Sequence, residues 1–250
     1  MSIFRVMSAV FFGYVFLSIP ANATESEVGV SKKNNWSGIY IGLDSSHAAQ
    51  AEATECISGT WNCSGLPIAN PMQKASGATY GAHIGYNWKI QADYILGVEA
   101  SVQRPHISGA AIFPTVGQYK SSETKYDSLK TLQIRAGRDL GDSLIYLSGG
   151  LAWTKLTTTF INRYDNGDII NFPNGFLSTS NSARGHVFGV GAEHVLTESL
   201  SLNAEFSRVY FPSHQFDVST QINGGVAQNW AYVKVNPNLN IAKLSVNYRY

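Results

Sequence analysis

Residues 239–250 read LNIAKLSVNYRY, and this stretch shows how the rest of the chain is built. Apolar and polar side chains alternate along it, which predicts a β-strand with two unlike faces. One face carries Ala242, Leu244, Val246, Tyr248 and Tyr250. The other face carries Lys243, Ser245, Asn247 and Arg249. The segment also ends on an aromatic residue, a feature that a water-soluble barrel does not need.

The same alternation, with many Tyr, Val, Ile and Thr residues, recurs in earlier segments. With the last segment included, the eight predicted strands are residues 36–46, 77–90, 93–104, 128–139, 143–157, 183–195, 200–211 and 239–250. Short turns (91–92, 140–142, 196–199) alternate with long connections (47–76, 105–127, 158–182, 212–238). This alternation predicts an antiparallel up-and-down order of strands.

Two kinds of β-barrel fit this pattern. A soluble lipocalin-like barrel turns its apolar face inward, whereas a membrane barrel turns that face toward lipid. The polar face is rich in Gly and Ser, as a narrow lumen requires, and charged residues are only 14% of the chain, against roughly a quarter to a third of a soluble surface. Aromatic residues stand near strand ends, where a membrane girdle would lie: Tyr86, Trp88, Tyr94, Trp153, Tyr210, Tyr248 and Tyr250. We therefore predict an all-β fold, an eight-stranded antiparallel up-and-down transmembrane β-barrel with short periplasmic turns and four long extracellular loops.

The start of the chain predicts export. Residues 1–23 contain one positive charge, Arg5, then an uncharged apolar run over residues 6–19 and the small residues Ala-Asn-Ala at 21–23. This is the pattern of a signal peptide cleaved after residue 23; the alternative, a retained membrane anchor, would need about 20 apolar residues. We expect a cleaved signal peptide (1–23), a flexible lead-in (24–35) and an outer-membrane β-barrel domain (36–250). Without Arg5 the chain is formally neutral, and it has no basic run of the kind that binds nucleic acid.

Four segments, taken in order and spacing, resemble a known family. They are NNWSGIYIGLD (34–44), LQIRAGRDLGDSLIYLSGGLAW (132–153), GVGAEHVLTESLSLNAEFSRVYF (189–211) and LSVNYRY (244–250). They are similar to the small alphaproteobacterial outer-membrane β-barrel proteins of the RopB type, a porin family that includes heme-binding members. The resemblance implies an eight-stranded barrel whose final aromatics, Tyr248 and Tyr250, form the C-terminal insertion signal. Tyr250 stands where the family usually has Phe, and His194 where an aromatic is common. The resemblance implies no single activity, because the family is mostly structural or adhesive.

Charged residues fall on the face that is predicted to line the lumen. They are Glu99, Arg135, Glu193, Glu205, Lys243 and Arg249. Because a buried charge is costly unless it is paired, we expect an ion-pair network there. About eight strands leave an interior that side chains just fill, which favours a plugged barrel over a gated conductance path. Glu193 and Glu205 could serve a glycosidase only beside a sugar cleft, and no GxSxG motif is present, so we expect no enzymatic activity.

The cysteines and histidines give weaker signals. Cys56 and Cys63 lie close together in CISGTWNC, which in an oxidising compartment predicts a disulfide, since a metal site would need more ligands. His47, His106 and His214 fall in or near the predicted outer loops without metal-ligand spacing, and we expect no metal and no cofactor.

The leading functional hypothesis from the sequence is a structural outer-membrane protein, placed in lipid by the barrel-assembly machinery, with a plugged lumen and surface-exposed loops. One alternative is a narrow passive channel for ions or small solutes. Another is surface binding of heme or of a host partner through the loops.

Overall fold

The computed structural model describes residues 35–50, 54–58, 75–91, 93–115, 118–164, 176–222, 226–235 and 237–250. All of them belong to the unit Lys33–Tyr250. The predicted signal peptide and the lead-in up to residue 34 lie outside the described residues. Within the described ranges, no helix is long and apolar enough to cross a membrane.

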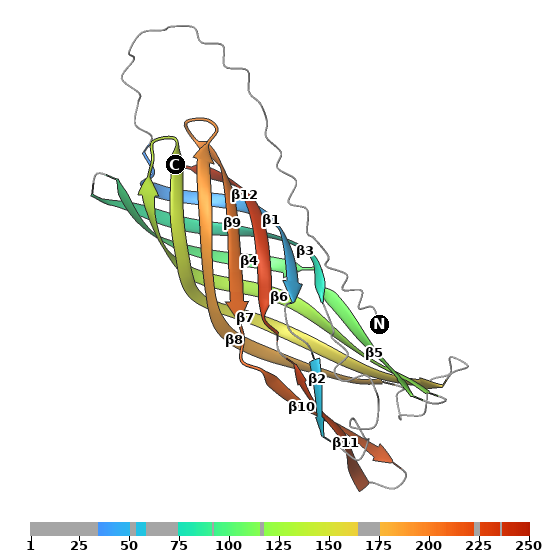
Figure 1. Ribbon diagram of the computed structural model, residues 1–250. Helices are drawn as coiled ribbons and strands as arrows, with labels where there is room; N and C mark the ends of the chain where they lie inside the picture. The colour runs from blue at the N-terminus through green and yellow to red at the C-terminus, as the bar shows by residue number, and fades with distance from the viewer. Residues whose placement is uncertain are drawn as a thin grey trace, which may run out of the picture. The chain divides into compact units, whose positions relative to one another are not determined.

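Eight strands form a closed antiparallel β-barrel (Figure 1). They are β1 (Gly38–Gln50), β3 (Ser76–Gln91), β4 (Tyr94–Pro105), β6 (Gln118–Asp139), β7 (Ser143–Tyr164), β8 (Phe176–Val195), β9 (Leu200–Tyr210) and β12 (Leu239–Arg249). Neighbours around the barrel follow the order β1-β3-β4-β6-β7-β8-β9-β12, and β12 pairs back onto β1. The predicted eight-stranded antiparallel fold is thus confirmed. Each predicted strand overlaps one of these, and β1, β6, β7 and β8 extend four to ten residues beyond their predicted bounds at the loop end.

The strands of the barrel are staggered. Directly paired residues, followed once round from Tyr40, lead back to β1 at Gln50, ten residues further on. The path runs through Gly85, Glu99, Gln133, Gly150, Val187, Val209 and Leu239. Closing a barrel with such a stagger tilts the strands by roughly 35–45° to its axis. Residues that meet across the lumen therefore come from different positions along their strands.

The predicted long loops contain more strand than the sequence indicates. β6 begins at Gln118, β7 ends at Tyr164 and β8 begins at Phe176, each several residues beyond its predicted bound. β5 (Ser108–Thr115) pairs with β6, while β2 (Thr54–Ser58), β10 (His214–Ile222) and β11 (Val226–Val235) form a separate three-stranded sheet. The prediction of plain loops was wrong here, because main-chain pairing needs no alternation of side chains.

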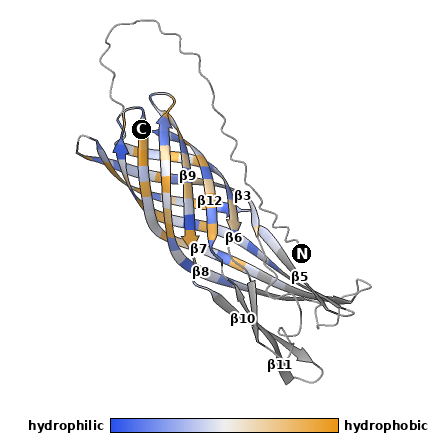
Figure 2. Cartoon of the chain, in the orientation of Figure 1, coloured by the Kyte–Doolittle hydropathy of each residue, from blue (hydrophilic) through white to orange (hydrophobic). Residues whose placement is uncertain are grey.

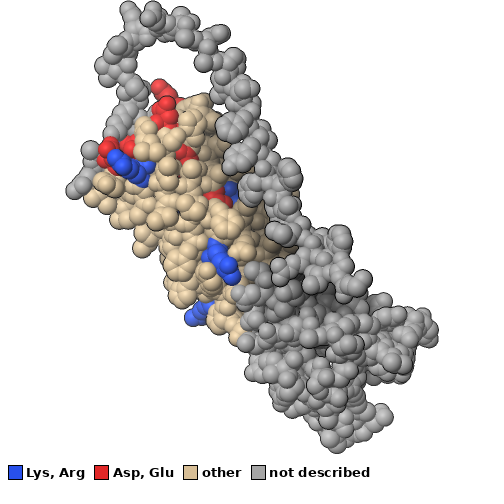
Figure 3. Space-filling view, viewed as in Figure 1, with Lys and Arg blue, Asp and Glu red and all other residues tan. Residues whose placement is uncertain are grey.

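The apolar face of the barrel points outward. Leu43, Ile134 and Leu147 are 72%, 61% and 65% exposed, whereas the residues that follow them, Asp44, Arg135 and Ser148, are buried. Figure 2 shows the resulting alternation of orange and blue along the strands, and Figure 3 shows a flank with few charges. An exposed apolar surface of this extent is typical of a lipid-facing belt. The predicted orientation, apolar face toward lipid, is confirmed.

Candidate functional site

The centre of the lumen holds a buried charged layer built around Arg135 on β6. One guanidinium nitrogen, Nη1, donates to Glu99 Oε2 at 3.0 Å and to the Tyr40 hydroxyl at 2.6 Å. The other, Nη2, donates to Glu193 Oε2 at 3.2 Å. The Arg135 guanidinium also lies over the Tyr146 ring, 3.8 Å from its centroid. This arginine therefore joins β1, β4, β7 and β8 across the lumen.

Lys243 on β12 completes the charged layer from the opposite wall. Its ammonium nitrogen lies 3.3 Å from Glu99 Oε1 and 3.5 Å from Glu205 Oε1. The Tyr146 hydroxyl lies 2.9 Å from Glu205 Oε2, to which it donates. Three carboxylates thus meet two cations, and neutral donors supply further hydrogen bonds: Tyr40 to Glu99, Tyr146 to Glu205 and Ser201 to Glu193. Such sharing offsets the cost of removing the charges from water.

Two glycines make room for the tyrosines of the charged layer. Tyr40 is paired with Gly85 on β3, and Tyr146 with Gly191 on β8. A Cβ atom at Gly85 would lie 2.2 Å from Cζ of Tyr40, and one at Gly191 would lie 2.3 Å from Cζ of Tyr146. The rings therefore lie flat across the neighbouring strand, which brings both hydroxyls to the carboxylates.

Polar residues continue the lumen toward the loops. Asp44 Oδ1 lies 2.8 Å from His83 Nδ1 and accepts a hydrogen bond from Ser245 at 2.7 Å. Thr79 contacts Ser46 and donates to Gln103 at 3.0 Å, and Ser101 contacts Thr131. All of these side chains are buried, so this part of the lumen is bridged by hydrogen bonds between strands.

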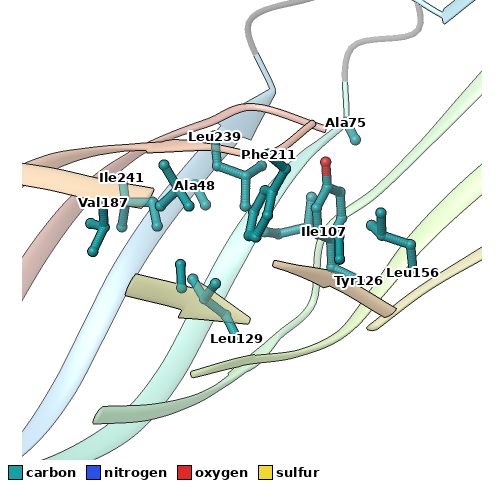
Figure 4. Close-up of a cluster of buried hydrophobic side chains, with 13 residues drawn as sticks. Ala48, Ala75, Ile107, Tyr126, Leu129, Leu156, Val187, Phe211, Leu239 and Ile241 are labelled. Carbon is teal, nitrogen blue, oxygen red and sulfur yellow. The ribbon is translucent and has the colours of Figure 1, made fainter. Parts of the chain in front are cut away.

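An apolar layer of buried side chains lies in the lumen at its loop end (Figure 4). Its members are Ala48, Ala75, Ile107, Tyr126, Leu129, Ala152, Leu156, Ala183, Val187, Val209, Phe211, Leu239 and Ile241. Leu129, Val209 and Leu239 are completely buried. Those members of the layer that lie in barrel strands occupy the same inward face as the charged residues. The lining of the lumen therefore changes from charged to apolar from the turn end to the loop end.

Trp36 lies at the turn end of the lumen. It is completely buried, packs with Ile95, Leu144 and Tyr146, and its indole nitrogen donates to the carbonyl oxygen of Gly141 at 3.0 Å. Gly141 belongs to the turn between β6 and β7, far from Trp36 in the sequence. The residues just before β1 therefore reach across the mouth of the barrel.

The structure places the six predicted lumen charges as follows. Glu99, Arg135, Glu193, Glu205 and Lys243 come together in the charged layer. Arg249 stands apart at the turn-side mouth, with its guanidinium 4.1 Å from the Trp36 ring centroid and Nη1 3.3 Å from the Asn35 carbonyl oxygen. The sequence reasoning missed Tyr40 and Tyr146, although both stand at inward positions of their strands.

The remaining predicted residues are spread over the chain. His47 lies within β1 on its outward face rather than in a loop, and His106 follows β4 with its ring 6.2 Å from that of Tyr80. Their strands are separated by β3. The side chains of Cys56 and His214, and all of Cys63, lie outside the described residues. Within the described part of the chain, no cluster of His, Cys, Asp or Glu could hold a metal ion.

The closed barrel and its apolar outer surface define a bacterial outer-membrane protein. Residues 10–249 match the outer membrane protein beta-barrel domain family, and the chain belongs to this family. It is 25% identical over 203 residues to the 31 kDa outer-membrane immunogenic proteins of Brucella melitensis and Brucella suis, covering 77% of this chain and 77% of theirs. The outer membrane protein OprG of Pseudomonas aeruginosa has a similar fold, with a TM-score of 0.50 at 14% identity, covering 87% of this chain and 98% of that one. The predicted family and the outer-membrane location are confirmed.

Proposed function

We propose that this protein is a structural outer-membrane barrel with a closed lumen, with surface-exposed loops and without enzymatic activity. The proposal rests on the layers that follow one another along the barrel axis. From the turn end to the loop end they are Trp36, the charged layer, the hydrogen-bonded polar residues and the apolar layer. An ion crossing this path would have to separate paired charges and then pass buried leucine and valine side chains. The carboxylates of Glu193 and Glu205, which a hydrolase would need free, accept hydrogen bonds from Arg135, Ser201 and Tyr146.

Planar-bilayer recording of the purified full-length protein tests the closed lumen. We expect no reproducible open-channel steps. Steps that recur and that change their cation preference in a Glu205→Gln variant would contradict the proposal, because Glu205 lies in the lumen. The matched control is Glu198→Gln in the exposed turn between β8 and β9, which should leave any leak unchanged.

A narrow passive channel is the second candidate. One observation favours it: Asp44 Oδ2, His83 Nε2 and the side-chain amide of Asn247 are buried and have no hydrogen-bond partner among the described protein atoms. Buried polar atoms of this kind are commonly satisfied by water. Water in the middle of the lumen would leave a shorter stretch of packed side chains for an ion to pass, which favours a channel.

Two further parts of the proposal concern partners. Tyr248 in β12 and Tyr250 just after it are exposed on the lipid-facing side, with ring centroids 4.9 Å apart, and we assign them to recognition by the barrel-assembly machinery. Surface binding of heme or of a host partner stays a hypothesis about the loops. A heme titration that shows a Soret shift in the wild type, weakened when His47, His106 and His214 are replaced, would support it.

A further inference from the structure

Basic side chains gather on the lipid-facing side of the barrel near its loop end. They are Arg104 on β4, Lys130 on β6, Lys155 on β7, Arg184 on β8 and Arg208 on β9. These strands are consecutive neighbours in the barrel, so the residues form an arc, called the basic arc below. In each strand the basic residue occupies the same face as exposed apolar residues nearer the turns, such as Leu132 on β6 and Phe188 on β8.

The basic arc lies at the level of the apolar layer inside the barrel. Lys130 follows Leu129 in the chain, Arg184 follows Ala183, and Arg208 precedes Val209. At this level the wall thus has apolar side chains inside and cations outside. The cations lie beyond the belt of exposed apolar residues, where a headgroup region would begin.

Trp153 stands between two of these cations. It is paired with Lys130 on one side and with Arg184 on the other. Because neighbouring strands lie about 5 Å apart, the two cations start roughly 10 Å apart across the indole. Tryptophan is enriched at membrane interfaces, and long basic side chains extend from the lipid edge toward the headgroups. On β9, the Arg208 guanidinium lies 5.1 Å from the Tyr210 ring centroid, which repeats the pairing of cation and aromatic.

Within the described part of the chain, no ion pair joins an acidic side chain to Lys130, Lys155 or Arg184 at the centre of the basic arc. Among the described side chains at the loop end, Glu123 and Asp127 are the acidic ones, and both lie further out along β6 than Lys130. Glu123 lies 3.2 Å from Lys125, and Asp127 accepts a hydrogen bond from Thr157 at 3.0 Å. The turn end differs, because there basic Arg138 and Lys89 mix with acidic Asp142 and Glu198. If the charged residues at the two ends of the barrel served solubility alone, positive and negative side chains would be mixed at both ends.

We propose that the basic arc binds the phosphate groups of a phosphorylated glycolipid in the outer leaflet, with the acyl chains packed on the apolar belt below it. Arginine matches the geometry of phosphate with paired hydrogen bonds, and lysine adds a point charge. The arrangement of apolar belt, interfacial aromatics and cations follows the order of acyl chains, glycosidic backbone and phosphates in such a lipid. This inference is independent of whether the lumen is closed.

The test measures binding of a diphosphorylated lipid A to the full-length protein in phosphatidylcholine nanodiscs. Lys130→Gln/Arg184→Gln should weaken binding by roughly ten- to thirty-fold, because each basic residue near an anionic lipid surface contributes several-fold. The charge-retaining variant Lys130→Arg/Arg184→Lys should stay close to wild type. The control Arg138→Gln, an exposed arginine at the turn end of β6, should bind as wild type does.

A second probe separates phosphate recognition from packing of acyl chains. The same glycolipid without phosphates should bind weakly, and equally to wild type and to Lys130→Gln/Arg184→Gln. Equal affinity of that variant and wild type for the phosphorylated lipid would overturn the proposal. So would equally tight binding of soluble polyphosphate, since the arc would then be a general polyanion site. Heat-modifiable migration on gels verifies that each variant is a folded barrel.

Discussion

The two halves of the lumen are filled in opposite ways. Toward the turns, charges are neutralised by partners on several strands, and Arg135 alone contacts Tyr40, Glu99 and Glu193. Toward the loops, aliphatic side chains such as Leu129 and Leu239 pack against one another (Figure 4). The stability of a charged half depends on complete pairing, whereas that of an apolar half depends on filled volume. Under the proposal of a closed lumen, the two halves contribute to closure by different means, which variants can separate.

The largest effect is expected in the charged layer. Arg135→Met leaves the Glu99 and Glu193 carboxylates buried without the guanidinium between them, so the free energy of unfolding should fall by roughly 3–5 kcal/mol. Urea unfolding in lipid vesicles, followed by gel mobility, measures it. Arg138→Met on the same strand is the control, because Arg138 is exposed, and it should change stability little. Equal losses in both variants would show that the pairing contributes no special stability.

A smaller loss is expected in the apolar layer. Leu129→Ala opens a cavity among completely buried neighbours and should cost about 3 kcal/mol in the same unfolding measurement. The control is Leu132→Ala on the lipid-facing side of β6, where Leu132 is 45% exposed. Lipid chains can fill the space there, so its loss should be clearly smaller. If the two alanine variants behave alike, the interior at Leu129 is not tightly packed.

The glycines that lie beneath the rings of Tyr40 and Tyr146 should also contribute to stability. Gly191→Ala places a Cβ atom 2.3 Å from Cζ of Tyr146, so the ring must move away from the Glu205 carboxylate. The expected loss is roughly 1–3 kcal/mol, as for other overpacked cores. Gly149→Ala is the control, since the nearest atom to its Cβ would be at 3.5 Å. Unchanged stability of Gly191→Ala would mean that Tyr146 shifts at no cost.

The smallest effect is expected at the edge of the lumen. Lys89 lies 3.0 Å from Asp139, but its side chain is 28% exposed and water competes for the ion pair. Lys89→Gln should therefore cost at most about 1 kcal/mol. A loss as large as that of Arg135→Met would show that this edge pair belongs energetically to the buried layer.

Strand parity assigned the charged residues of the site to the inward face. Glu99, Arg135, Glu205 and Lys243 were expected in a lumen ion-pair network because they occupy inward positions of their strands. The apolar layer was not predicted. Leu129 and Val187 also occupy inward positions, but the sequence alone does not show where along the barrel axis the lining of the lumen changes from polar to apolar. Arg249 was grouped with the other charges, yet it lies beside Trp36, because the approach of residues 35–36 to the mouth depends on contacts across the barrel.

The sequence by itself determined that alternating segments would form strands, that their apolar face would meet lipid, and that turns and loops would lie at opposite ends. The strands and the two ends follow from the two-residue period of a strand and from the length of each connection, both of which are local. The lipid-facing side follows from the low content of charged residues and from the aromatic residues near strand ends. Only the tertiary structure decided which inward residues meet. The ten-residue stagger between Tyr40 and Gln50 brings Arg135 to Glu193 and Lys243 to Glu99, and the closing pair of β12 and β1 completes the wall. Stagger and closure are properties of the whole barrel, because each pairing is fixed only when the ring of strands is complete.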